Sequence, residues 1–303
     1  MSLQNSSCII LNRGNNSNTD SSKPNVMNFQ LPTPFVCYDY EIALANLYIY
    51  NSWFNVIGGL SNYNDDNYSI AYNGVTTLIT MPDGNYSIND IGGYLQLQLD
   101  TLGYYLTNTT TGVRTYYQQI LTNTVYYSAE YIANPVPASG AAAIALGLDG
   151  SSAQALAFIA LAGGYTPQLI TGSDNFYQLI GALPNTSYPA STTTTTLYNT
   201  TFAPGVPNIA LNANAINVQC NLTFDSRFNT SPQTIYTFSS NVAFGSQIQI
   251  IPPSLIWYSC LDGTYQNIII TFQSADDNSN LPIRDQNIIC SLIIRKKAKY
   301  ITY

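Results

Sequence analysis

The feature that most restricts the fold is an alternating pattern in the C-terminal third of the chain. Between Ile216 and Phe224, apolar residues alternate strictly with Asn, Gln and Thr. A period of two places alternate side chains on opposite faces of a β-strand, so this segment predicts a strand with one buried and one solvated face. The same alternation, or a turn followed by an apolar run, predicts further strands at 247–250, 255–260, 265–272 and 288–294. Short strands in loops rich in Asn, Gly and Pro are typical of a β-sandwich or barrel.

The N-terminal part of the chain also favours strands. The stretch from Cys37 to Val56 is rich in Tyr, Ile and Leu without helical spacing, which predicts one long strand buried on much of both faces. Two shorter strands are expected at 68–72 and 75–81, because the turn-forming pair Asn73-Gly74 separates them.

One helix is predicted after these strands, over residues 88–102. Ser87 with Asp90 three positions later matches a capping box, which satisfies free amides at a helix start. Apolar residues then recur on one helical face, at Ile88, Ile91, Leu95, Leu99 and Leu102. The pair Gly92-Gly93 opposes this prediction, since each glycine costs about 1 kcal/mol relative to alanine.

Composition along the chain suggests three parts. Residues 1–34 are mostly Asn, Ser, Thr, Lys and Pro, which predicts a flexible N-terminal arm. Residues 104–207 have almost no charge, many small residues and a threonine run at 192–196, which predicts an inserted domain. Residues 35–103 together with 208–303 are then expected to form the main β domain.

The residue types present argue against catalysis. The chain of 303 residues contains no histidine and only 8% charged residues, about a third of the usual fraction. Without histidine there are no Ser-His or Cys-His pairs and no His-ligated metal sites. No phosphate-binding glycine motif occurs, and neither Glu41 nor Glu130 lies in a recognisable motif. We therefore expect no enzymatic activity, no catalytic residue and no cofactor.

Two adjacent carboxylate pairs are the only candidates for a cation site. Asp65-Asp66 and Asp276-Asp277 lie in Asn-rich segments, where such pairs are usually solvated turn formers. Asp276, Asn278 and Asn280 match the start of an EF-hand loop, but Leu281 and Asn287 replace its glycine and closing glutamate. The EF-hand interpretation fails, whereas an irregular calcium site stays open, and no metal ligand is assigned.

Five cysteines are widely spaced, at positions 8, 37, 220, 260 and 290. Their number is odd and no CxxC motif occurs, so neither a disulfide framework nor a zinc knuckle is indicated. Buried free thiols are expected. No apolar run approaches the roughly 20 residues of a membrane span, so we expect a soluble protein without one.

The charge is distributed unevenly. The formal net charge is −7, and four of the nine basic residues lie near the C-terminus: Arg295, Lys296, Lys297 and Lys299. Without these four, 5 basic and 16 acidic residues remain, a net charge of −11, which disfavours general nucleic-acid binding. The basic cluster could contact nucleic acid or an acidic partner, and the alternative is a solvated strand end.

Three short segments resemble a known family. They are 81–88 (Met-Pro-Asp-Gly-Asn-Tyr-Ser-Ile) leading into the predicted helix, 268–272 (Ile-Ile-Ile-Thr-Phe), and 281–285 (Leu-Pro-Ile-Arg-Asp) followed by the apolar strand 289–294. After a polar N-terminal segment and a long strand, this arrangement resembles the penton (minor capsid) proteins of virophages and Polinton-like viruses. The similarity covers residues 35–103 and 208–303.

The resemblance implies an all-β fold: a single jelly roll of two four-stranded antiparallel sheets, with one short helix and a large insertion. It implies a homopentamer at the five-fold vertices of an icosahedral virion, made in the host cytoplasm. The implied partners are further copies of the chain, the major capsid protein and packaged DNA, the last through the C-terminal basic cluster. It implies no catalytic or binding residue. A lectin-like β-sandwich that binds host glycans through Tyr, Trp and Asn remains the alternative.

Overall fold

A computed structural model describes residues 6–15, 23, 25–58, 66–191, 195–202, 207, 215–223, 233–276 and 278–297. The chain forms two compact units. Unit 1 combines Met1–Trp53 with Asn212–Tyr303, and unit 2 is the intervening segment Phe54–Leu211. Strand pairs in both units are antiparallel, which confirms the mostly β fold predicted from the sequence.

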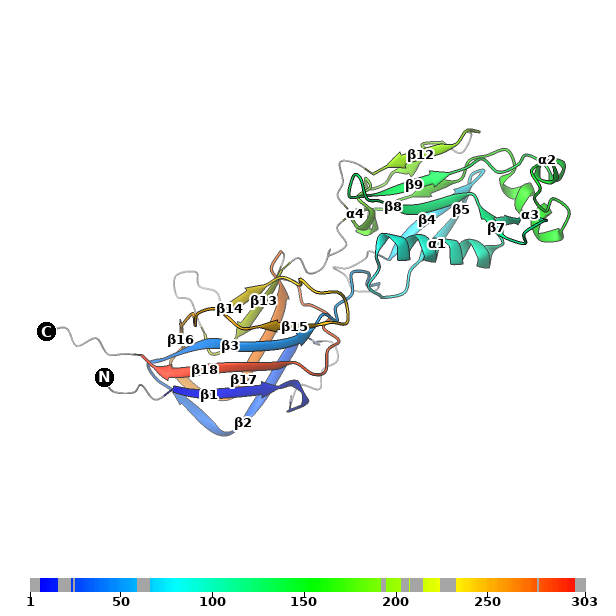
Figure 1. Cartoon of the computed structure of the whole chain (residues 1–303). Coiled ribbons are helices and arrows are strands. Elements are labelled where there is room, and N and C mark those ends of the chain that lie inside the picture. The colour runs from blue at the N-terminus through cyan, green and yellow to red at the C-terminus, as the bar shows by residue number, and fades with distance from the viewer. Residues whose placement is uncertain are drawn as a thin grey trace. The chain divides into compact units, whose positions relative to one another are not determined.

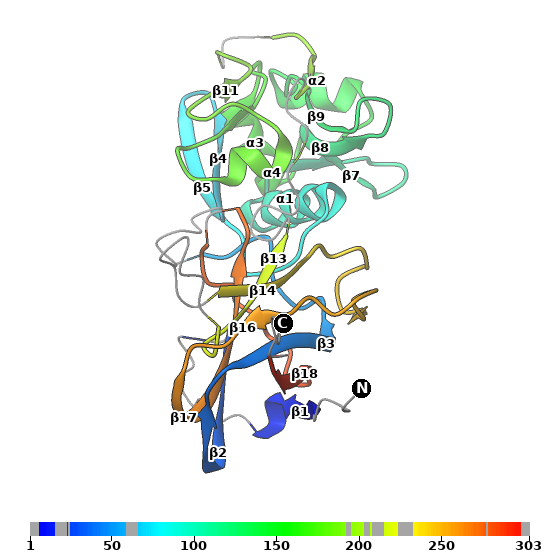
Figure 2. The same cartoon turned by 90° about the vertical axis from the view of Figure 1, so that its left-hand side faces the viewer.

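Unit 1 contains two sheets (Figure 1). Its strands are β1 (Ser6–Asn12), β2 (Val26–Cys37), β3 (Tyr40–Tyr50), β13 (Ile216–Cys220), β14 (Gln233–Phe238), β15 (Gln247–Ile250), β16 (Tyr258–Ser259), β17 (Gly263–Ser274) and β18 (Ile289–Lys296); a 3-10 turn at Arg13–Asn15 follows β1. The first sheet has the order β1-β18-β3-β15, and β16 also pairs with β3. The second has the order β14-β13-β17-β2. In Figure 2, β2 and β17 lie side by side, as their register requires.

The alternating segments supply the core of unit 1. Ile216, Val218 and Cys220 of β13 are buried, and their neighbours on the same strand are partly exposed. Val218 pairs with Phe272 of β17, which is also fully buried. One hydrophobic cluster joins these side chains to those of β3 and β18, so the core of unit 1 contains residues from both sheets.

The predicted N-terminal arm is wrong where the structure describes it. Residues 6–12 form β1, which pairs with β18 from Ser6–Arg295 to Asn12–Ile289. Residues 26–37 form β2, whose Met27 and Phe29 are buried. The segment is polar overall, but a strand at a sheet edge needs few apolar residues when its backbone pairs with a neighbour. The long strand predicted over 37–56 is also interrupted, because Asp39 (φ 58°) turns the chain between β2 and β3.

Unit 2 mixes small sheets with helices. Its strands are β4 (Asn67–Tyr72), β5 (Val75–Thr80), β6 (Tyr105–Thr107), β7 (Arg114–Tyr116), β8 (Gln118–Asn123), β9 (Ser128–Ala133), β10 (Gln168–Ile170), β11 (Ser187–Tyr188) and β12 (Tyr198–Thr201), and its helices are α1 (Ile88–Leu102), α2 (Gly140–Ala145), α3 (Ala153–Ala162) and α4 (Phe176–Ile180). The sheets have the orders β11-β10-β4-β5, β12-β9-β8 and β6-β7. Among the described residues, no helix is long and apolar enough to cross a membrane.

The predicted helix is confirmed over 88–102. The Ser87 side chain accepts from the backbone amide of Asp90, and the Asp90 carboxylate accepts from the amide of Ser87. Gly103 ends the helix in the left-handed conformation. Gly92, which seemed unfavourable, has a packing role: a Cβ built there would lie 2.1 Å from the carbonyl oxygen of Ile120 on β8. Helix α1 can approach β8 this closely only without a side chain at that position.

The predicted domain boundaries do not match the two units. Residues 54–103 were expected in the main β domain, but β4, β5 and α1 belong to unit 2. Strand β4 pairs with β10, and the buried face of α1 joins the second hydrophobic cluster. Local patterns identify strands without showing which sheet they join, so the insertion is larger than predicted. The one short helix expected in the main β domain is likewise misplaced, because α1 belongs to unit 2, whose described part contains four α-helices.

Candidate interaction surfaces

The predicted basic cluster lies at the end of β18, where Arg295 is engaged by its neighbours. Its Nε lies 2.5 Å from Oε1 of Glu41, the residue opposite it on β3. Its guanidinium carbon lies 3.6 Å from the ring centroid of Trp257, in cation–π contact. The carboxylate offsets the charge of this guanidinium and the indole covers one of its faces, so its attraction for a phosphate is reduced.

The two lysines that follow are also placed among acidic segments. The Lys296 ammonium lies 5.7 Å from the ring centroid of Tyr40, and the Lys297 amide donates to the carbonyl of Asp39 at 2.9 Å. The amide of Asp39 donates in turn to the Asp262 carboxylate at 3.0 Å. The Glu41 carboxylate and the backbone of Asp39 thus contact this cluster, and the Asp262 carboxylate binds that same stretch of backbone. Lys299 lies outside the described residues.

The described members of the calcium candidates bond to neighbouring protein groups. The side-chain oxygen of Asn280 accepts from Asn25 at 2.9 Å, and the Asn278 amide closes a turn onto the carbonyl of Ser274. Asp66 is buried and accepts from Asn67 at 2.6 Å, and burial with the charges of Asp174 and Asp83 raises its pKa. Across the described residues, no three His, Cys, Asp or Glu side chains group as metal ligands. Asp65 and Asp277 lie outside the described residues.

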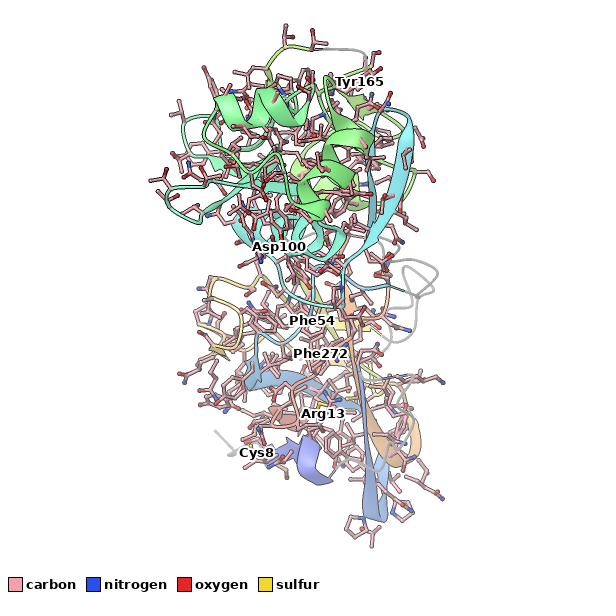
Figure 3. The ribbon with its side chains drawn as sticks, turned by 90° about the vertical axis from the view of Figure 1, so that its right-hand side faces the viewer. Cys8, Arg13, Phe54, Asp100, Tyr165 and Phe272 are labelled. Carbon is pink, nitrogen blue, oxygen red and sulfur yellow. The ribbon has the colours of Figure 1, made fainter. Side chains whose placement is uncertain are left out.

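The cysteines are free thiols, as expected, but the expected burial holds for only four of the five. Cys8 is exposed on β1 (Figure 3), and the other four are buried. Burial raises the pKa of the Cys220 thiol to about 12 and also raises those of Cys37, Cys260 and Cys290. Buried thiols with raised pKa values are poor nucleophiles, so these side chains act as small apolar core residues.

Unit 2 carries a surface feature that was not predicted, at the turn between β8 and β9. Val125, Tyr126 and Tyr127 follow one another there with exposed fractions of 78%, 66% and 80%. We call these three residues the hairpin tip. Three consecutive large side chains in water are unusual unless they meet another surface. The only signal in the sequence is the absence of charge and glycine from a turn between two strands.

The backbone of the hairpin tip is held in one conformation. The side-chain oxygen of Asn123 accepts from the amides of Val125 and Tyr126, at 3.1 and 3.2 Å. Its side-chain nitrogen donates to Glu130 at 3.2 Å. Tyr127 adopts a left-handed conformation (φ 48°), which is unfavourable for a bulky residue. Fixing the backbone that carries these rings reduces the backbone entropy lost on contact with a partner.

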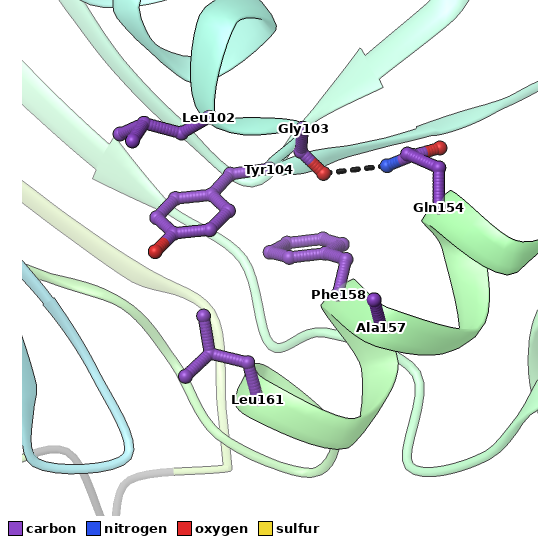
Figure 4. A pocket seen from close by; sticks show the side chains of 7 residues that line it. All are labelled: Leu102, Gly103, Tyr104, Gln154, Ala157, Phe158 and Leu161. Carbon is purple, nitrogen blue, oxygen red and sulfur yellow. Dashed lines mark hydrogen bonds between the residues drawn. The ribbon is translucent and has the colours of Figure 1, made fainter.

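A second feature of unit 2 is a cavity of about 280 Å³ between the end of α1 and helix α3 (Figure 4). It is lined by Leu102, Gly103, Tyr104, Gln154, Ala157, Phe158 and Leu161. The rings of Tyr104 and Phe158 lie nearly parallel, with centroids 5.7 Å apart. We call this cavity the α1–α3 pocket.

The α1–α3 pocket is apolar and offers few free polar groups. Gln154 donates to the carbonyl oxygens of Gly103 (2.5 Å) and Tyr105 (2.9 Å), so its amide nitrogen is occupied. None of the lining residues is charged. Asp100, two residues before Leu102, forms an ion pair with Arg114 at 2.7 Å. The pocket therefore suits an uncharged side chain better than a charged ligand.

Charge differs sharply between the two units. Unit 1 contains eight acidic and eight basic residues, whereas unit 2 contains eight acidic residues and one basic residue, Arg114. The net charge of −7 therefore belongs entirely to unit 2. This corrects the expectation of an acidic body with one basic end, because that end folds into a neutral unit.

Comparisons with known proteins give matches among solved structures, but none among family models or curated sequences. No protein-family model matches the chain, and no curated protein sequence matches it. Among solved structures, the chain is similar to a crystal structure of the selenomethionine-labelled mavirus penton protein. The similarity covers 97% of this chain and 99% of that chain, with a TM-score of 0.45 and 9% sequence identity.

Proposed function

We propose that the chain is a structural protein of a viral capsid and that unit 1 is a single jelly roll. The observation that carries this proposal is the strand order. We number the strands of unit 1 from one to eight along the chain, leaving out the short β16. The first sheet then has the order one-eight-three-six, and the second has the order five-four-seven-two. Two four-stranded sheets connected in this way are the arrangement of a jelly roll, a fold used by capsid proteins and lectins.

The sequence resemblance favours a capsid protein among the proteins with this fold. On this basis we infer that five copies form a closed ring at each five-fold vertex, in contact with the surrounding major capsid protein. A ring requires one surface of each copy to bind a different surface of the next. With only 8% charged residues, the chain can bury polar surface at such contacts with little desolvation of charge.

The test is the mass and shape of the purified full chain. We expect sedimentation at about five times the 33.2 kDa of one chain, and five-fold rings in negatively stained images. A monomer or trimer at all concentrations, without rings, would contradict the vertex role. A glycan array, with and without calcium, tests the lectin-like alternative in parallel.

The proposal also includes a contact with packaged DNA. Lys296, Lys297 and Lys299 are its candidates, because Arg295 is engaged by Glu41 and Trp257. Replacing the three lysines by Gln should weaken co-assembly with DNA and flatten its salt dependence. Arg295→Gln is the matched control, expected to change unit 1 stability more than DNA binding. Co-assembly that is equal for all variants across salt concentrations would exclude this contact.

A further inference from the structure

The hairpin tip and the α1–α3 pocket form a complementary pair on one unit. The tip projects three large uncharged side chains, and the pocket is an apolar recess lined by aromatic and aliphatic groups. In Figure 1, the β8–β9 turn and helix α3 lie at opposite ends of unit 2. A protrusion and a recess at opposite ends of one molecule cannot meet within that molecule, but they can meet between copies.

We propose that the hairpin tip of one copy inserts into the α1–α3 pocket of the next copy. This contact joins two different surfaces, so it repeats from copy to copy and forms a ring where the rotation between copies closes. The inference rests on the proposed function only for the number of copies in that ring; the contact itself is argued from unit 2 alone.

Charge limits where two copies can meet through unit 2. Unit 2 carries a net charge of −7, so two copies repel each other over most of this unit. The hairpin tip and the lining of the pocket contain no carboxylate, and the only carboxylate bonded near the tip, Glu130, accepts from Asn123. Contact through these two features brings the copies together where repulsion is least. The association should therefore strengthen as salt screens the remaining charge.

The size of the α1–α3 pocket favours a protein side chain over a small-molecule ligand. At about 280 Å³, the pocket is at or below the lower end of the range for small-molecule sites, but it is large enough for part of one or two side chains. The Gln154 amide nitrogen is already bonded, so the Tyr104 hydroxyl is the one side-chain donor that the lining leaves to orient a sugar. Tyrosine suits this role, because its ring is apolar and rigid while its hydroxyl can stay at the wet rim.

Single substitutions at exposed positions test the contact in the full chain. Tyr126→Ser removes a ring from the tip, and Ala157→Glu places a charge in the pocket from an exposed position on α3. Each should weaken self-association in sedimentation velocity about tenfold or more, the effect of losing an interface anchor. Two matched controls should leave it unchanged: Ala160→Glu, exposed on α3 outside the pocket lining, and Leu183→Ser, 65% exposed elsewhere on unit 2.

Cross-linking tests the geometry directly. Tyr126→Cys and Ala157→Cys are combined in a Cys8→Ser background, since Cys8 is the exposed native thiol. With oxidised glutathione as the oxidant, we expect a ladder of disulfide-linked species on a non-reducing gel. Either single-cysteine variant should give no ladder.

The outcomes separate this inference from the proposed function. Rings that persist in both variants without cross-linking would overturn the contact and leave the vertex role intact. Cross-linking and variant-sensitive association without five-fold rings would support the contact and contradict the vertex role. A chain that neither associates nor cross-links contradicts both. Glycan binding that Ala157→Glu abolishes, without cross-linking, would assign the pocket to a sugar and overturn the contact.

Discussion

The two units of this chain build their buried cores from differently arranged segments. Unit 1 joins segments far apart in the sequence: β18 lies between β1 and β3, and β17 pairs with β2. Unit 2 is one continuous segment, in which α1 packs on the β8–β9 hairpin and β4 pairs with the next strand, β5. Unit 1 is formally neutral, whereas unit 2 holds the whole net charge of −7.

This difference separates two tasks within one chain. A sandwich of long paired strands with balanced charge can pack closely against neighbours, because it presents no net repulsion. A locally folded, acidic unit can vary its surface without disturbing that sandwich, because it interrupts the sequence of unit 1 at a single place. We therefore expect unit 1 to be the more dependent on the intact chain and unit 2 the more autonomous.

The largest expected effect comes from ending the chain after residue 211. This truncation removes β13–β18, the partners of β1, β2 and β3, while leaving unit 2 complete. Unit 1 should unfold entirely and unit 2 should remain folded. Hydrogen–deuterium exchange with mass spectrometry should show no protection in residues 26–50 and full protection in α1. Residues 54–211 expressed alone should match this pattern, and an unfolded 54–211 fragment would refute the autonomy of unit 2.

A glycine pair in α1 tests whether close packing in unit 2 is independent of unit 1. Gly92→Ala places a Cβ against the Ile120 carbonyl and should destabilise unit 2 by about 3 kcal/mol, the cost of overpacking. Gly93→Ala is the matched control, since nothing lies within 4 Å of its Cβ; it should stabilise α1 by up to about 1 kcal/mol. Denaturant titrations of exchange protection should show both changes in unit 2 alone. Equal destabilisation of unit 1 by Gly92→Ala would mean that the units unfold together.

The capping box of α1 provides a smaller effect at the start of the same helix. Ser87→Ala removes the acceptor for the Asp90 amide and should cost about 1 kcal/mol. Ser87→Thr keeps an acceptor and should cost less. The measurement is the unfolding midpoint of unit 2 in urea. A loss of the same size in both variants would show that the cap contributes through packing instead.

The smallest expected effect is a pH dependence confined to unit 2. Burial and the nearby Asp174 and Asp83 raise the pKa of Asp66, so the folded unit binds a proton at a higher pH than the unfolded chain does. The free energy of unfolding of unit 2 then increases as the pH falls from 7 towards about 4.5. This pH range lies above the usual pKa values of other carboxylates. Asp66→Asn should remove this increase and leave unit 1 unaffected. A variant that still gains stability over this pH range would point to another group.

The sequence predicts elements better than it predicts their partners. The alternation at Ile216, Val218 and Cys220 identifies β13, because burial of one face leaves a direct period in the sequence. The capping residues Ser87 and Asp90 locate the start of α1 correctly for the same local reason. Strand β1 is missed because its stability comes from pairing with β18, which lies nearly three hundred residues away.

The interaction surfaces show the same limit. A run of basic residues is visible at 295–299 in the sequence. The ion pair of Arg295 with Glu41 and its contact with Trp257 depend on segments far away in the chain. The α1–α3 pocket combines residues about fifty positions apart, so no short motif marks it. The hairpin tip is contiguous in sequence, yet its exposure follows from the β8–β9 register, in which Asn123 pairs with Ser128.

The placement of the cysteines has a practical consequence. All five cysteines and both tryptophans, Trp53 and Trp257, belong to unit 1, and unit 2 contains neither residue type. Indole fluorescence and the rate at which a thiol reagent labels the four buried cysteines therefore report on unit 1 alone, in the unmodified protein. The described α-helices all lie in unit 2, and the described part of unit 1 adds the 3-10 turn at Arg13–Asn15. Unfolding of unit 2 should therefore dominate the loss of the helical circular dichroism signal. The natural chain thus contains separate optical and chemical reporters for its two units.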